Sequence, residues 1–154
     1  MRPLSSDLRE FIHLLNTNRV KYVIVGAWAL AFHGRPRYTG DLDIFIARDD
    51  ENAARLIAVI DAFGFGQAGI KREDFLQLDH VIQLGGEPNR IDILTGISGV
   101  TFDEAWANRE PGNIADSAAF VISRDLLIKN KRAANRDKDQ GDIKLLEKTR
   151  PPRS

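Results

Sequence analysis

The sequence predicts a single domain of the α/β (α+β) class. Two features predict it. Short apolar runs of strand length, over 21–25 and 41–47, alternate with longer segments whose apolar residues recur every three or four positions, the spacing of an amphipathic helix. At 154 residues the chain can bury a core of its own. Neither a repeat nor a linker interrupts it, so we expect one domain over 1–150 and a disordered tail over 151–154.

The first half is expected to contain three helices and two strands. Ser6 can cap a helix that continues to about Asn16, because its apolar residues share one face. The elements expected next are a buried strand over 21–25, a short helix over 27–33, a strand over 41–47 and a helix, capped by Asp50, through about residue 63. Glycines follow the second and third of these helices, as is usual where helices end.

The second half is expected to add two strand pairs and three helices. After a helical turn near 71–76, the strands 79–84 and 89–94 are joined by Gly85-Gly86-Glu87-Pro88, a strong turn signal. The elements expected next are a helix opened by Thr101, short strands at Ile114 and 118–122, a helix capped by Ser123 through about Ala133, and a last helix over 137–148.

Two acidic residues, Asp41 and Asp43, begin the second apolar strand. Residues i and i+2 of a strand point to the same face, so both carboxylates can reach one point while Leu42 faces the other side. Two close carboxylates repel each other unless a proton or a cation lies between them. Oxygen ligands of this kind suit Mg²⁺ or Mn²⁺. The pair predicts a metal site; the alternative is two solvated acids at the entrance of a strand.

A third carboxylate, Asp92, lies inside the strand predicted over 89–94. It faces away from Ile91 and Ile93, on the polar side of the strand. An acid in a strand interior is costly unless it is paired or bound to a metal. We therefore predict Asp92 as the third metal ligand, with an ion pair to Arg90 as the alternative. Asp79, at the edge of a predicted strand, is a weaker candidate.

A glycine turn, Gly26-Ala27, separates the first strand from the helix that follows it. Backbone N–H groups at a helix start can bind an anion, which makes both residues candidates for binding phosphate. The alternative is a glycine that serves the turn geometry alone. Thirteen residues, 28 to 40, separate this turn from Asp41. That length suffices for a short helix and a return loop into a neighbouring strand.

These residues resemble the signature of the polymerase-β-like nucleotidyltransferases. The resemblance is carried by Gly26-Ala27, Arg37-Tyr38-Thr39 and Asp41-Leu42-Asp43. The run from Val25 to Gly34, with Arg37 and Thr39, is most similar to the small bacterial AbiEii-toxin-like group. It is also similar to the small lincosamide nucleotidyltransferases, which carry a tryptophan after their glycine pair. The chain departs from the family at position 27, where Ala replaces the usual Gly or Ser.

The resemblance implies the nucleotidyltransferase fold, a mixed, mostly antiparallel sheet flanked by helices. It also implies transfer of an NMP from an NTP, ATP among them, to an acceptor hydroxyl with release of pyrophosphate. Asp41, Asp43 and Asp92 would be the catalytic residues and would hold Mg²⁺ or Mn²⁺. Arg37 and Thr39 would bind nucleotide, with a salt bridge from Arg37 to Asp41 as the alternative. RNA, protein and small-molecule acceptors all remain open.

The C-terminal segment is basic, although the formal net charge of the chain is zero. Residues 1–122 contain 12 Lys and Arg against 17 Asp and Glu, whereas residues 123–154 contain 10 against 5. The segment resembles the Arg-x-Lys-Asp-x-x-Asp motif of AbiEii-toxin-like proteins, whose positions are taken by Arg136, Lys138, Asp139 and Asp142. We expect Lys129 and Lys138 to bind the triphosphate. The alternative is an exposed i,i+4 pair between Lys138 and Asp142.

Composition excludes several other functions. The chain has no cysteine, which excludes disulfides, a thiol nucleophile and a zinc–thiolate site. The first residues lack the apolar core of a signal peptide and the longest apolar run is too short to span a bilayer, so we expect a cytoplasmic protein without a membrane partner. The alternative function is a catalytically silent protein of the same fold that serves as a binding subunit or a toxin–antitoxin component.

Overall fold

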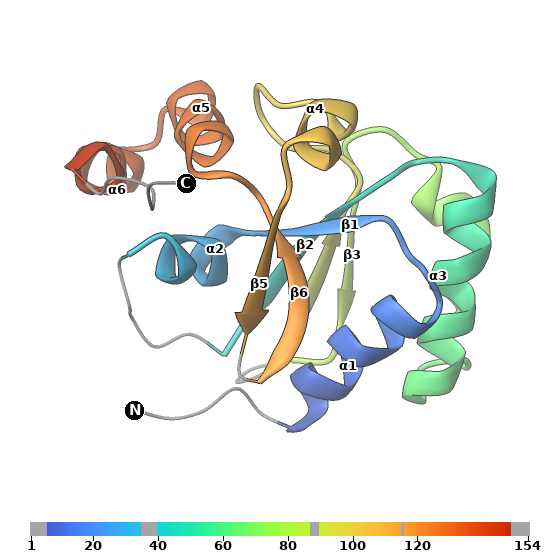
Figure 1. Ribbon diagram of the computed structural model, residues 1–154. Helices are drawn as coiled ribbons and strands as arrows, with labels where there is room; N and C mark the ends of the chain where they lie inside the picture. Colours follow the sequence, from blue (N-terminus) through green and yellow to red (C-terminus); the bar gives the residue numbers. More distant parts are fainter. Residues whose placement is uncertain (1–5, 35–39, 87–89, 115, 149–154) are drawn as a thin grey trace.

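Six strands form one central sheet with helices on both sides (Figure 1). The computed structural model describes residues 6–34, 40–86, 90–114 and 116–148. The elements in chain order are α1 (Ser6–Thr17), β1 (Tyr22–Val25), α2 (Gly26–Phe32), β2 (Leu42–Ile46), α3 (Asp50–Phe63), the 3₁₀ helix η1 (Arg72–Phe75), β3 (Val81–Leu84), β4 (Ile91–Leu94), α4 (Phe102–Ala107), β5 (Glu110–Ile114), β6 (Ser117–Val121), α5 (Arg124–Ala134) and α6 (Asp137–Lys148).

The order of elements confirms the predicted fold class. The strands lie in the order β3-β4-β2-β1-β6-β5. The pairs β2–β4 and β1–β6 are parallel, and the other three pairs are antiparallel. The sheet is therefore mixed and mostly antiparallel. The strands β1, β2, β3 and β4 are each one or two residues shorter than predicted.

Two predicted caps, Ser6 and Asp50, are wrong, because each residue already lies inside its helix. We expected Asp50 to cap α3, but the cap is Asp49, whose side chain accepts a hydrogen bond from the N–H of Asn52 at 2.8 Å. Asp49 has extended backbone angles, whereas Asp50 already belongs to the first helical turn. A capping side chain must come from the non-helical residue before that turn. The caps predicted at Thr101 and Ser123 are confirmed.

The two faces of the sheet pack against different helices. Tyr22 faces α1, where its hydroxyl donates to Asn16 at 2.8 Å. On the opposite face, Phe45 of β2 packs edge-on against Phe102 of α4, with ring centroids 5.3 Å apart. Asp43 lies two residues before Phe45 and so shares its face. The acidic residues therefore open toward α4, α5 and α6, away from the core between the sheet, α1 and α3 (Figure 1). None of the described helices is long and apolar enough to cross a membrane.

One buried side chain, Asn52 near the start of α3, binds backbone groups next to the first residue of β1. It is 2% exposed. Its amide oxygen accepts from the Lys21 N–H at 2.8 Å, and its amide nitrogen donates to the carbonyl oxygens of Lys21 and Ala47 at 3.1 and 2.9 Å. Asn52 thus satisfies three backbone groups beside β1 and β2, and its contact with the Ala47 carbonyl is buried.

We predict that Asn52→Ala lowers the free energy of unfolding by at least about 2 kcal/mol, because it leaves buried backbone groups without partners. Urea denaturation would measure the change. The exposed Asn108→Ala is the control, with an expected change within about 0.5 kcal/mol. Equal stabilities of the two variants would show that the Asn52 network does not support the sheet.

Candidate active site

The predicted aspartates meet on one face of the sheet because of strand register. Asp43 of β2 lies opposite Asp92 of β4 in the parallel pair and opposite Val25 of β1 in the antiparallel pair. Asp41 precedes β2 by one residue and shares the face of Asp43. The side chains of Asp41 and Asp92 are 29% and 12% exposed. Three carboxylates are therefore brought together at the ends of two neighbouring strands.

The cluster carries more negative charge than its surroundings balance. The pKa of Asp43 is raised to about 7, first by burial, then by the charge of Asp92, a hydrogen bond with it, and the charge of Asp41. Arg90 opposes this rise. Its guanidinium donates to both oxygens of Asp92 at 3.0 and 3.1 Å and lies 3.5 Å from an oxygen of Asp41. The ion pair considered as an alternative for Asp92 is present, and it lies within the acidic cluster.

The glycine turn lies directly against Asp43. Gly26 has φ of +70°, a left-handed conformation that favours glycine, and a Cβ at this position would collide with the Asp43 carboxylate. Val25 precedes the helix in an extended conformation, and among the described residues no side chain caps the first turn of α2. The close approach of backbone and carboxylate requires glycine at position 26. The alanine at position 27 has no such constraint.

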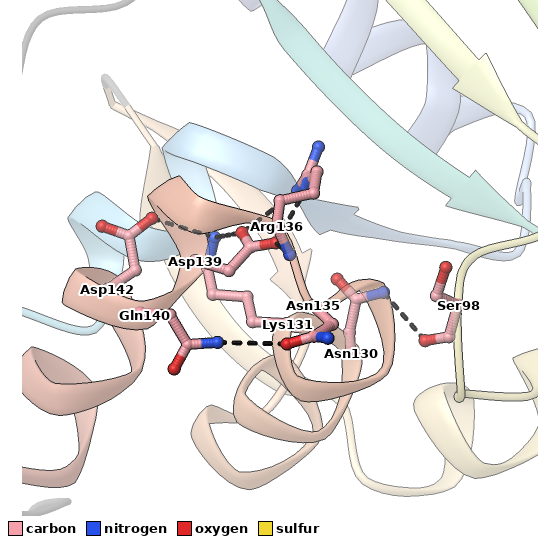
Figure 2. A network of polar contacts seen from close by, with 8 residues as sticks. All are labelled: Ser98, Asn130, Lys131, Asn135, Arg136, Asp139, Gln140 and Asp142. Atoms are coloured by element: carbon pink, nitrogen blue, oxygen red, sulfur yellow. Dashed lines mark hydrogen bonds and ion pairs between the residues drawn. The ribbon is translucent and has the colours of Figure 1, made fainter.

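The corner between α5 and α6 gathers the cations Lys131 and Arg136 around two acids, Asp139 and Asp142 (Figure 2). Lys131 is buried and lies 3.4 Å from Asp139 and 3.1 Å from Asp142. Arg136 donates to both oxygens of Asp139 at 2.8 and 3.2 Å. Hydrogen bonding from Arg136, with the nearby charge of Lys131, lowers the pKa of Asp139 to about 2. Asn135, in a left-handed conformation, makes the turn that folds α6 back onto α5.

Two cavities adjoin at Asp43. The smaller, about 280 Å³, is lined by the three aspartates, Arg90, Gly26, Ala27, Lys131, Arg136, Lys138 and Asp142. The larger, about 420 Å³, is bordered by Gly26, Asp43 and Arg136 and continues along Gly96, Ser98 and Asn130. Gly26, Asp43 and Arg136 line both, so they mark the boundary between them. The smaller cavity has acids on its sheet side and cations on its helical side.

The two lysines predicted to bind phosphate have different positions. Lys138 lines the smaller cavity with the aspartates. Lys129 does not: it pairs with Glu104 of α4 at 2.9 Å and its side chain is 53% exposed. Arg37 and Thr39 lie outside the described residues, as does the tail 151–154.

Sequence reasoning missed Lys131, although a signal was present. Lys131 lies four residues after Leu127 and three after Ile128, the spacing of the apolar face of α5. A lysine on a buried face needs a partner or a function. Lys129 belongs to the outer face of the same helix.

The donor set suits a divalent metal, although its oxygens are engaged within the protein. Carboxylate oxygens without sulfur or imidazole are the ligands of Mg²⁺ and Mn²⁺. In the described part of the chain, no three acidic or histidine side chains already have metal-ligating geometry. Asp43 is hydrogen-bonded to Asp92, which Arg90 also holds. A metal would relieve the repulsion that raises the pKa of Asp43, and Arg90 would have to withdraw from Asp92.

Comparison with solved structures identifies the fold. No protein-family model and no curated protein matches the sequence. The lincosamide antibiotic adenylyltransferase LnuA, solved with lincomycin bound, is 16% identical, with a TM-score of 0.57 over 97% of this chain and 100% of LnuA. The antibiotic-resistance factor ANT(2'')-Ia is 15% identical, with a TM-score of 0.58 over 92% of this chain and 80% of that one. A candidate nucleotidyltransferase from Thermotoga maritima is 16% identical, with a TM-score of 0.58 over 93% and 91%.

These similarities show that the chain has the nucleotidyltransferase fold. At such low identity they define the fold and leave the activity to be argued from the site. The AbiEii-toxin-like subgroup stays a prediction from the sequence resemblance.

We predict that Asp43→Asn stabilises the metal-free protein near neutral pH and has little effect at acidic pH. The raised pKa of Asp43 means that the native state binds more protons than the unfolded state between about pH 4 and pH 7. Wild-type stability therefore falls as pH rises through this window. At pH 8 the variant should gain at least about 1.4 kcal/mol, the equivalent of one pKa unit, as measured by urea denaturation in EDTA. A difference that is the same at pH 4.5 and pH 8 would contradict this prediction.

Proposed function

We propose that the protein is a metal-dependent nucleotidyltransferase, which transfers an NMP from an NTP to an acceptor hydroxyl and releases pyrophosphate. The observation that carries the proposal is the convergence of Asp41, Asp43 and Asp92 with the cations of α5 and α6 in one cavity. Acids can hold metal there while cations bind phosphate. The names of LnuA and of ANT(2'')-Ia bound to adenylyl-2"-tobramycin support ATP as the donor.

The three aspartates are proposed to have two roles, to hold metal ions and to accept a proton. Two Mg²⁺ ions, when bound by Asp41, Asp43 and Asp92, would balance phosphate charge and lower the pKa of the acceptor hydroxyl. Asp92 is the residue proposed to accept the hydroxyl proton. The acceptor oxygen bonds to the α-phosphorus as the bond from that phosphorus to the bridging oxygen breaks. Pyrophosphate leaves with the electron pair of that bond.

The cations are proposed to hold the triphosphate. Lys131, Arg136 and Lys138 line the cavity opposite the acids, where they can neutralise charge that develops on the phosphates. The N–H groups of Gly26 and Ala27 are proposed to donate to phosphate oxygens, and the family resemblance adds Arg37 and Thr39. On α5 we assign the phosphate role to Lys131 in place of Lys129, because Lys131 lines the cavity with the aspartates and Lys129 does not.

The acceptor is proposed to be a molecule with a free hydroxyl group: an RNA end, a protein side chain or a small molecule. A silent binding subunit or toxin–antitoxin component is the alternative, since position 27 departs from the family and Arg90 holds Asp92. Incubation with each labelled NTP, Mg²⁺ or Mn²⁺ and fractionated cell extract would separate the two. A transferase labels one acceptor fraction, whereas a silent protein labels none.

We predict that Asp41→Asn, Asp43→Asn and Asp92→Asn each abolish labelling of that fraction while the protein stays folded. Each change removes a negative ligand without changing side-chain size. The readouts are labelled product and Mg²⁺ affinity by calorimetry, with Asp61→Asn on α3 as the control. Wild-type turnover in Asp43→Asn would end the assignment of a metal site.

We predict that Lys131→Met and Lys138→Ala each reduce transfer at least about tenfold, which corresponds to about 1.4 kcal/mol in the barrier, whereas Lys129→Ala changes it less than about twofold. Lys131→Met leaves Asp139 and Asp142 without their cation, so thermal melting must accompany the assay. Lys131→Arg keeps the charge and should retain the fold. Equal loss in Lys129→Ala and Lys131→Met would contradict the assignment on α5.

A further inference from the structure

A further cavity, of about 660 Å³, opens at the other end of β1. It lies where the turn between α1 and β1 meets the end of α4 and the β5–β6 pair. It shares none of its described lining residues with the two cavities at Asp43. Lys21 lines it, whereas Val25, four residues further along the strand, borders the site. At about 3.3 Å per residue the two positions are about 13 Å apart.

One wall of this cavity is flat and aromatic. Trp106 of α4 packs edge-on against Phe120 of β6, with ring centroids 5.5 Å apart and an interplanar angle of 78°. Its other neighbour is Phe102, stacked at 5.9 Å. Both Trp106 and Phe120 are half-buried, so part of each ring faces the opening. Phe102 stacks on the indole and the Arg109 guanidinium lies over its ring, so these neighbours hold the indole in one orientation.

The remaining walls combine small or apolar residues with four cationic side chains. The cavity is lined by Arg19, Lys21, Arg55 and Arg109, and none of its described lining residues is acidic. This composition is a local exception, because residues 1–122 as a whole contain 12 Lys and Arg against 17 Asp and Glu. Arg55 is balanced by Glu51 at 2.7 Å. In the described part of the chain, the other three cations make no ion pair with a carboxylate.

Arg109 joins the cationic and aromatic parts of the cavity. Its guanidinium lies 3.7 Å from the centroid of the Trp106 ring and 4.9 Å from that of Phe120. One terminal nitrogen donates to the Trp106 carbonyl at 2.7 Å, which fixes the group, whereas Nε is buried and has no hydrogen-bond partner in the described structure. A buried donor of this kind favours an anionic or polar group beside it.

We propose that this cavity binds a small organic anion with a flat apolar body, such as an aromatic carboxylate, sulfonate or phosphate. Its volume lies in the range of small-molecule sites. The planar guanidinium of Arg109, seated over the Trp106 ring, fits a flat body, and the three cations without carboxylate partners fit the anionic group. They converge on one concave surface and do not extend along the protein, which favours a small ligand over a polyanion. The proposal is independent of the transferase activity.

A suitable probe is anilinonaphthalene sulfonate, titrated into the full-length ¹⁵N-labelled protein in the presence of ATP and Mg²⁺. The two tryptophans of the chain provide an internal control, because Trp106 borders the cavity and Trp28 lies on α2. The indole N–H signal of Trp106 should shift with saturation and that of Trp28 should not. Trp106→Phe and Trp28→Phe assign the two signals.

The charge requirement is tested with variants and with a neutral analogue. Lys21→Met, at an exposed position on the rim, should weaken binding at least about tenfold, and so should replacement of the probe by uncharged phenylnaphthylamine. The control is Arg72→Met, an exposed arginine of η1, which should leave the affinity unchanged. The proposal is overturned if Lys21→Met binds as the wild type does, if the probe binds only when ATP and Mg²⁺ are left out, or if the Trp28 signal shifts instead. If a short oligothymidylate at an equal concentration displaces the probe, the ligand of the cavity is nucleic acid and the small-anion proposal is wrong.

Discussion

The organisation of the site depends on the repulsion between carboxylates fixed on neighbouring strands. Backbone register places Asp43 beside Asp92, and side-chain motion cannot separate them far. The protein meets this charge in two ways: a proton retained by Asp43 up to about pH 7, and the guanidinium of Arg90. A divalent cation can take the place of both the proton and the guanidinium. The same excess of negative charge that destabilises the empty cluster is therefore the basis of its proposed affinity for metal.

The C-terminal helices complement this charge through a second, self-contained network. Asp139 is fully buried and binds Arg136 and Lys131, so the two cations are held in place before any ligand arrives. Charged groups fixed by other charged groups lose little conformational freedom when they bind phosphate. The tight turn at Asn135 closes the network by folding α6 onto α5. Asp139, which lies outside the cavity lining, is thus interpreted as a residue that orients the cations, whereas Asp142 lines the cavity beside Lys131.

The two ends of β1 lie beside different cavities. At one end, Gly26 lets the backbone approach an acidic cluster suited to metal and phosphate. At the other, Lys21 begins the strand beside a cationic, aromatic cavity. The core between the sheet, α1 and α3 supports both ends of β1. Asn52 binds backbone groups of Lys21 and Ala47 at the end beside the aromatic cavity. A rigid strand with a separate site at each end allows each to change its ligand without rebuilding the other.

Much of the fold was predictable from the sequence, because apolar periodicity, glycine turns and polar caps are local signals. The strand alternation also singled out Asp41, Asp43 and Asp92 as one set. Local patterns could not determine which strands are neighbours, and hence that β2 pairs with β4 in a register that places Asp43 opposite Asp92. The apolar face of α5 does distinguish Lys131 from Lys129, but only the packing of α6 against α5 shows that Asp139 and Asp142 are the partners of Lys131. The cavity at Trp106 joins side chains from four separate segments, so tertiary structure alone creates it, because its charge and shape arise from residues distant in sequence.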